Sequence, residues 1–132
     1  VLLVLVLGVT AGLASYAPPV SAQSGPFSAE SQFGPIQLEM TVEPARVGAN
    51  EVHLYLFDAK TGAPFAKAKE LRVSGSLPEK SISLPLEPQL SGPGHYTIPS
   101  AFLNAKGDWC LEITVRVSAF TEYEKQIEVP IA

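Results

Sequence analysis

The sequence contains a single cysteine, Cys110, so a domain built from it must fold without an internal disulfide. Basic residues are also few: nine lysines and arginines stand against thirteen acidic residues, which gives a net charge of -4. The basic residues form no cluster along the sequence. Because a phosphate-binding surface needs clustered positive charge, this composition argues against a nucleic acid or an anionic lipid surface as the partner.

Motifs of known catalytic sites are missing as well. The sequence has no Ser/His/Asp arrangement on a nucleophile elbow, no glycine-rich phosphate loop before a helix, and no paired-histidine motif. Its carboxylates are scattered, and Glu122, Glu124 and Glu128 are typical of the solvated side of an edge strand. We therefore expect a protein that is not an enzyme.

An uncharged apolar run, VLLVLVLGVTAGLA, opens the sequence over residues 1–14. A membrane-spanning helix needs about 20 apolar residues, so this run is either the end of a longer transmembrane helix or the apolar core of a signal peptide. The small residues at 20–22, ahead of Gln23, match a signal cleavage site, and the proline pair at 18–19 ends the helix in both cases. Both interpretations place the rest of the chain outside the cytoplasm.

Three segments are predicted. Residues 1–15 form the apolar helix, and residues 16–35 are rich in proline, serine and glycine without a hydrophobic period, which is typical of a linker. Residues 36–132 remain for one domain with a modest core.

Apolar and polar residues alternate from Ile36 onward, with the period of two that indicates a strand with one buried face. The clearest case begins at Trp109, where every second residue up to position 117 is apolar, and Trp109 itself is expected to fill the core. Similar patterns occur at 36–42, 52–56, 71–73, 82–86, 96–98 and 123–129. About seven short strands without a convincing helix predict an all-β fold, an antiparallel immunoglobulin-like β-sandwich.

Turn residues and prolines refine this prediction. The segment from Gly48 to Asn50 is expected to form a tight turn, with a positive φ at Gly48 and the Asn50 side chain bonded to the nearby backbone. Pro85 and Pro88 suit an edge strand, and Pro130 is expected to end the last strand.

Four sequence segments together carry a family resemblance. They are PARVGAN at 44–50, HLYLFDAKTGAP at 53–64, GHY at 94–96 and GDWCLEITV at 107–115. In this order and spacing they resemble the extracytoplasmic C-terminal domain of bacterial copper-resistance D (CopD) membrane proteins and the related YtkA-like domains. The last membrane helix of that family typically ends in a loop with a double proline, so the resemblance favours a transmembrane helix over a signal peptide at residues 1–15.

The resemblance implies an accessory domain at the C-terminal end of a bacterial plasma membrane protein for copper transport, resistance or homeostasis. Residues 16–132 would lie on the extracytoplasmic side. Copper would be the cofactor of the parent protein, and the partners would be the membrane and a copper ion or a periplasmic copper-binding protein. The alternative is a secreted or membrane-tethered immunoglobulin-like binding module with an unknown ligand, because a fold does not determine a function.

Copper ligands are scarce in this sequence. Imidazole suits Cu(II) and thioether or thiolate suits Cu(I), usually with two or more ligands converging. Met40 has the period of a core residue, and His53 alternates out of the core and is interpreted as a lone solvated histidine. His95, in a glycine-rich turn, is a further candidate. Cys110 is a ligand, a cross-linking thiol or a small filler on an outward face.

The sequence alone does not identify a metal site. The sequence does not show whether His53 and His95 meet. The segment 66–71 also lacks the methionine that YtkA-like domains often carry near their third strand, which leaves open whether this domain itself binds metal.

Overall fold

The computed structural model describes residues 25–132. The helix predicted at residues 1–15 and the first part of the predicted linker therefore lie outside the described residues. Within residues 25–132 there is no helix long and apolar enough to cross a membrane.

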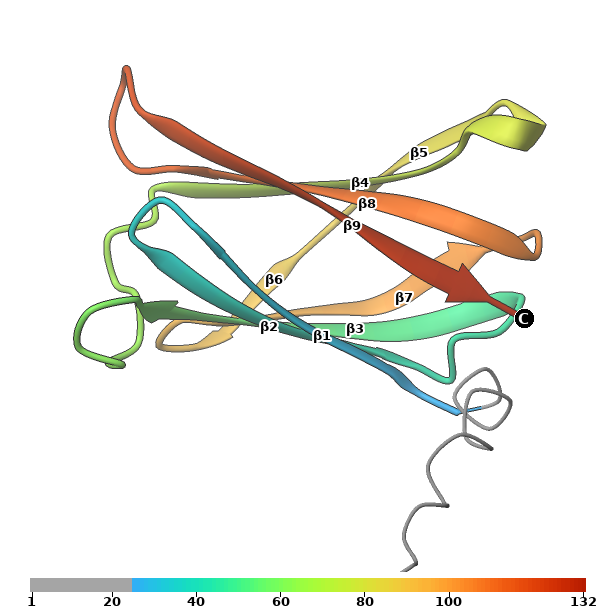
Figure 1. Ribbon diagram of the computed structural model, residues 1–132, viewed down its shortest axis with the longest axis horizontal. Helices are drawn as coiled ribbons and strands as arrows, with labels where there is room; N and C mark the ends of the chain where they lie inside the picture. The colour runs from blue at the N-terminus through green and yellow to red at the C-terminus, as the bar shows by residue number, and fades with distance from the viewer. Residues whose placement is uncertain (1–24) are drawn as a thin grey trace, which may run out of the picture.

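Nine strands, all within residues 25–132, form two antiparallel sheets that lie one over the other (Figure 1). One sheet has five strands in the order β1-β2-β3-β7-β6, and the other has four in the order β5-β4-β8-β9. The strands are β1 Phe27–Phe33, β2 Ile36–Glu43, β3 Gly48–Asp58, β4 Glu70–Leu77, β5 Ile82–Leu86, β6 Gln89–Gly92, β7 His95–Leu103, β8 Gly107–Arg116 and β9 Glu122–Ile131. A short 3-10 helix, η2 Pro78–Lys80, precedes β5. The predicted all-β class is confirmed.

The predicted number of about seven strands was too low, because β1 and β6 were missed. Strand β1 lies in the segment 16–35 that the sequence assigned to the linker, and it pairs with β2 from Phe27 opposite Val42 to Phe33 opposite Ile36. Both missed strands are sheet edges, and in them only Phe33 is buried. With so few buried residues, these two strands show no clear hydrophobic period. The sequence therefore did not reveal them.

The prolines occupy positions in the sheets that can be compared with those predicted. Pro85 lies in β5, which is an edge strand as predicted, whereas Pro88 lies between β5 and β6 and belongs to neither strand. Pro130 does not end the last strand: β9 continues to Ile131, and Pro130 pairs with Asp108 of β8. Because β9 is also an edge strand, one side of its backbone has no ladder partner, and a residue without an amide hydrogen is tolerated there.

One core fills the space between the sheets. Trp109 is fully buried, with 0% of its surface exposed, which confirms its predicted place. Met40 is 1% exposed, which confirms that it packs in the core. Buried residues alternate with more exposed ones along β2 and β3, and the largest fully buried residues besides Trp109 and Met40 are Ile36, Leu38, Leu54, Leu56, Leu77, Ile98, Leu103, Leu111, Ile113 and Val42.

The turn between β2 and β3 is held by the side chain of Asn50, which is 1% exposed. Its Oδ1 atom accepts hydrogen bonds from the backbone amides of Ala45 at 2.7 Å and Arg46 at 3.3 Å. Its Nδ2 group donates to the carbonyls of Arg46 at 2.9 Å and Gly48 at 3.0 Å. Gly48 has a φ of 117°, so the predicted positive φ and the predicted bonding of Asn50 are confirmed. The predicted place of the turn is wrong, because Gly48 to Asn50 already belong to β3 and the turn occupies residues 44–47.

We expect Asn50→Ala to lower the free energy of unfolding by about 2–4 kcal/mol. Each buried backbone group left without a partner costs about 1–3 kcal/mol, and the amide of Ala45 loses its partner in a buried place. Urea denaturation followed by circular dichroism measures the change, with Asn104→Ala, at an exposed position of the β7–β8 turn, as the matched control. A change for Asn50→Ala no larger than that of the control would contradict the assigned role.

Candidate metal centre

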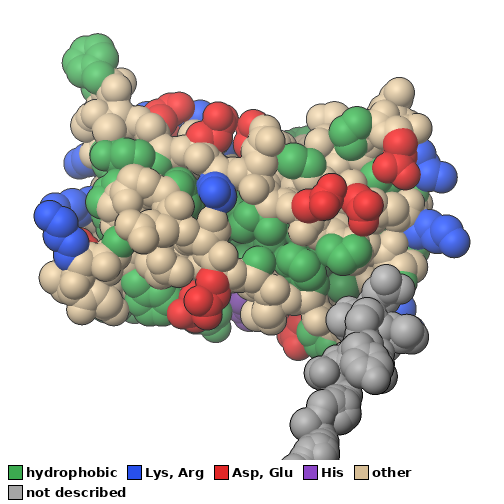
Figure 2. All heavy atoms as spheres, in the orientation of Figure 1, with side chains coloured by type: hydrophobic (Ala, Val, Ile, Leu, Met, Phe, Trp, Pro, Cys, Tyr) green, Lys and Arg blue, Asp and Glu red, His purple; other side chains and the backbone are tan. Residues whose placement is uncertain are grey.

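The two histidines of the sequence meet on the outer face of the five-stranded sheet, the side that points away from the four-stranded sheet. In β3 the buried residues Val52 and Leu54 point to the core, so His53 and Tyr55 point outward. The ladder between β3 and β7 places Tyr55 opposite His95. In Figure 2 the histidine atoms show at the lower edge of the molecule, where Figure 1 places this sheet, with acidic side chains beside them.

The imidazole nitrogens of this pair are in contact. His53 Nδ1 lies 3.1 Å from His95 Nε2, although the residues are 42 positions apart in the chain. The hydroxyl oxygen of Thr97 lies 3.4 Å from each of these nitrogens. The ring of Tyr55 stacks on that of His95, with 4.2 Å between ring centroids and 12° between planes. The interpretation of His53 as a lone solvated histidine is therefore wrong, because the pairing of β3 with β7 brings His95 beside it, and the local period does not reveal which strands pair.

The 3.1 Å separation suits two ligands of one metal ion. Metal–imidazole bonds are about 2.0–2.1 Å long, so two nitrogens bound at angles between square-planar and tetrahedral values lie about 2.8–3.4 Å apart. An N–H···N hydrogen bond has the same length. The pair is thus arranged so that an ion can replace the shared hydrogen with little movement of either ring.

A carboxylate holds the other nitrogen of His53. Its Nε2 atom lies 3.3 Å from Glu51 Oε1, and the His53 side chain is 24% exposed. With the proton on Nε2 donated to Glu51, the lone pair of Nδ1 faces His95. A carboxylate in this position orients a metal-binding imidazole and raises its basicity.

A second carboxylate, Glu43, lies beside Glu51. The two residues face each other directly in the ladder between β2 and β3. Glu43, Glu51 and His53 each offer one ligand atom, and these atoms all lie within 4.8 Å of one another. The two carboxylates, neither of which was predicted, differ in the signal they leave in the sequence: Glu51 lies two residues before His53 on the same face of β3, which the period of two shows, whereas only the register of β2 with β3 adds Glu43. Like charges directly opposite on a sheet are unfavourable, and a bound cation would remove that cost.

The sulfur-containing candidates lie elsewhere. Met40 is buried on the inner face of the five-stranded sheet. Cys110 lies on β8, in the other sheet, opposite Ser76 and Glu128. Burial, assisted by the charges of Glu112 and Glu128, raises the pKa of the Cys110 thiol, which disfavours the thiolate that a metal needs. Of the four candidates, the structure brings together His53 and His95.

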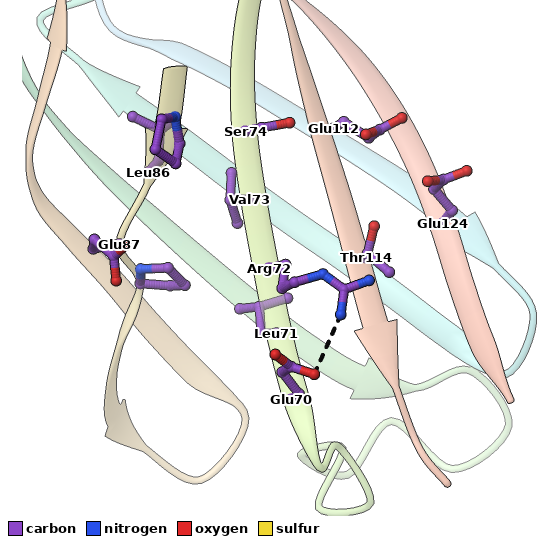
Figure 3. A pocket seen from close by; sticks show the side chains of 12 residues that line it. Glu70, Leu71, Arg72, Val73, Ser74, Leu86, Glu87, Glu112, Thr114 and Glu124 are labelled. Carbon is purple, nitrogen blue, oxygen red and sulfur yellow. Dashed lines mark hydrogen bonds and ion pairs between the residues drawn. The ribbon is translucent and has the colours of Figure 1, made fainter. Parts of the chain in front are cut away.

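A groove of about 500 Å³ lies on the four-stranded sheet, where β5 diverges from β4 (Figure 3). Its lining contains no histidine or cysteine. Arg72 donates hydrogen bonds to Glu70 and Glu122, both at 3.2 Å, so two charged groups of the lining, Arg72 and Glu70, already have partners. The donor set of the groove therefore fits a transition metal less well than the histidine pair does.

Comparisons with known proteins assign no family. No protein-family model matches the chain, and no curated protein matches it. Among solved structures, the chain is similar to a copper-bound single-substitution variant of FetP from uropathogenic Escherichia coli strain F11, with 9% sequence identity and a TM-score of 0.43. The similarity covers 81% of this chain and 90% of that chain. A likeness at this level carries no argument about the metal or its ligands, and the resemblance to copper-resistance D domains stays a prediction.

Proposed function

We propose that this chain is an extracytoplasmic, immunoglobulin-like accessory domain of a membrane protein for copper transport, resistance or homeostasis, and that it binds Cu(II) through His53 and His95. The observation that carries the proposal is the 3.1 Å contact between the two imidazole nitrogens. The apolar segment at residues 1–15 supports a tether to the membrane.

The donor set favours Cu(II) over Cu(I). Nitrogen and oxygen atoms surround the centre, and Cu(II) binds such ligands more tightly than the other common divalent metals of the first row do. The thioether of Met40 and the thiol of Cys110, which would suit Cu(I), lie on the opposite face of the sheet and in the other sheet. The oxidised ion is therefore the better fit.

The groups around the histidine pair attract a cation and leave a bound ion accessible. The carboxylates of Glu43 and Glu51 place negative charge next to His53, which attracts a cation. The two imidazoles leave part of the coordination shell of a bound ion free, and the side chain of His53 is partly exposed. A partner or a water molecule can reach the free positions, so the centre suits an accessory domain that receives and releases an ion.

A titration of the full 132-residue chain, kept in mild detergent because its first segment is apolar, tests the proposal. We expect one Cu(II) per chain at high affinity, an electron paramagnetic resonance spectrum with coupling to two nitrogen ligands, and Cu(I) affinity at least about tenfold lower. Imidazole coordination of Cu(II) is the physical reason for both results.

The matched control is the pair of substitutions Met40→Leu and Cys110→Ser, which should leave Cu(II) binding unchanged. Absence of Cu(II) binding by the wild-type chain would overturn the proposal. So would a copper site that survives in the double variant His53→Phe/His95→Phe.

A further inference from the structure

His53 stands between two sets of donors on the outer face of the sheet. Its Nδ1 atom faces His95, and its Nε2 atom faces Glu51, with Glu43 next to Glu51. A neutral imidazole has one lone pair, on whichever nitrogen carries no proton. One ring can therefore ligate an ion on the His95 side or on the carboxylate side, but not on both at once.

We propose that Glu43, Glu51 and the Nε2 atom of His53 form an outer metal position, which receives Cu(II) from solvent and passes it to the inner position between His53 and His95. This inference rests on the proposed function, because the inner position is the copper site proposed above.

The geometry of the outer position comes from two adjacent strands. Glu51 and His53 are two residues apart on β3 and point to the same face, and Glu43 of β2 is directly opposite Glu51. Directly opposite residues of an antiparallel pair have Cβ atoms about 4.5–5.5 Å apart, so both carboxylates can reach one ion. The ligand atoms of all three residues already lie within 4.8 Å of one another.

The exposure of the groups sets the order of loading. The side chain of Glu51 is 51% exposed and that of His53 is 24% exposed. An ion that approaches along the negative field therefore meets the carboxylates before it meets the imidazole pair. Cu(II) then gains by moving inward, because two imidazole nitrogens bind it better than one imidazole with carboxylates does.

The transfer needs one exchange of protons at His53. With the ion on Nε2, the proton sits on Nδ1 and is donated to His95 Nε2 over 3.1 Å. With the ion on Nδ1, the proton sits on Nε2 and is donated to Glu51 over 3.3 Å. One proton leaves Nδ1 for water and one is taken up from water at Nε2, so the charge is balanced. Each tautomer finds a hydrogen-bond acceptor already in place.

The rate of Cu(II) association tests the outer position. In the full chain, Glu43→Gln/Glu51→Gln should slow association at low salt about tenfold, because clustered charge near a site typically raises association rates by about 10–10³-fold. The equilibrium affinity should fall by about tenfold as well, because Glu51→Gln removes the carboxylate that raises the basicity of His53. The His53 ring keeps its orientation, since the amide oxygen that Glu51→Gln introduces can still accept the proton of His53 Nε2.

A matched control is present on the same sheet face. Glu30 of β1 and Glu39 of β2 also face each other directly and point outward. Neither belongs to the group formed by Glu43, Glu51 and His53. Glu30→Gln/Glu39→Gln changes the net charge by the same amount and should slow association less than about threefold. If the two double variants slowed Cu(II) association equally, the proposed outer position would be overturned, because general attraction by negative charge would explain the rates.

The equilibrium test uses His95→Phe, which removes the inner position and leaves the outer one. We expect this variant to retain one weaker Cu(II) site that disappears when Glu43→Gln/Glu51→Gln is added. No residual site in His95→Phe, with normal binding by the wild type, overturns this inference alone. No Cu(II) binding by the wild-type chain overturns the proposed function itself, so the two failures are distinguishable.

Discussion

His95→Phe is expected to lower the affinity for Cu(II) at least about 100-fold while the domain stays folded. Loss of a residue that merely supports a metal ligand costs about 10–100-fold in affinity, and loss of the ligand itself should cost no less. Phenylalanine keeps an aromatic ring in the stack with Tyr55, whose centroid lies 4.2 Å from that of His95, so the sheet face is preserved. Competition with a chelator of known affinity measures the change.

His53→Phe should reduce the affinity further than His95→Phe does. His53 contributes a nitrogen to both donor sets, whereas His95 contributes to one. The nitrogen coupling in the electron paramagnetic resonance spectrum should fall from two ligands to one in His95→Phe. Affinity within about threefold of the wild type in either single variant would show that the histidine pair is not the copper site.

Trp109→Ala is expected to lower the free energy of unfolding by about 3–5 kcal/mol, the usual cost of removing a large aromatic side chain from a core. Trp109 is fully buried, and its Nε1 group donates a hydrogen bond to the carbonyl of Ala105 at 2.8 Å. A domain of this size is stable by about 5–15 kcal/mol in total, so the substitution removes a large part of its stability.

Urea denaturation followed by circular dichroism is the suitable measurement, because the substitution removes the only tryptophan of the chain. Phe120→Ala is the matched control: the side chain is 98% exposed, and its removal should change the free energy of unfolding by less than about 0.5 kcal/mol. Trp109→Phe should fall between the two variants, since it keeps most of the apolar volume and loses the hydrogen bond to Ala105. Equal stabilities of Trp109→Ala and Phe120→Ala would contradict the assigned role of Trp109 in the core.

The inward residues of the fold were predictable where the strand has one buried face. In β2, and in β8 as far as Ile113, the alternation of burial follows the alternation of apolar and polar residues, so Met40 and Trp109 could be placed in the core from the local pattern. Strand β6 has no buried residue, and its position depends on pairing with β7 alone. Hydrogen bonds between the backbones of two strands do not require particular side chains, which is why this edge strand was missed.

The local sequence determined on which face each candidate ligand lies, because successive residues of a strand point to opposite sides. This period places His53 outward and Met40 inward. Only the tertiary structure decided that His53 meets His95 and Glu51 meets Glu43, since these contacts depend on the register of β3 with β7 and with β2. Register is set by turns, bulges and the packing of the whole core, and two residues 42 positions apart carry no local signal of their contact.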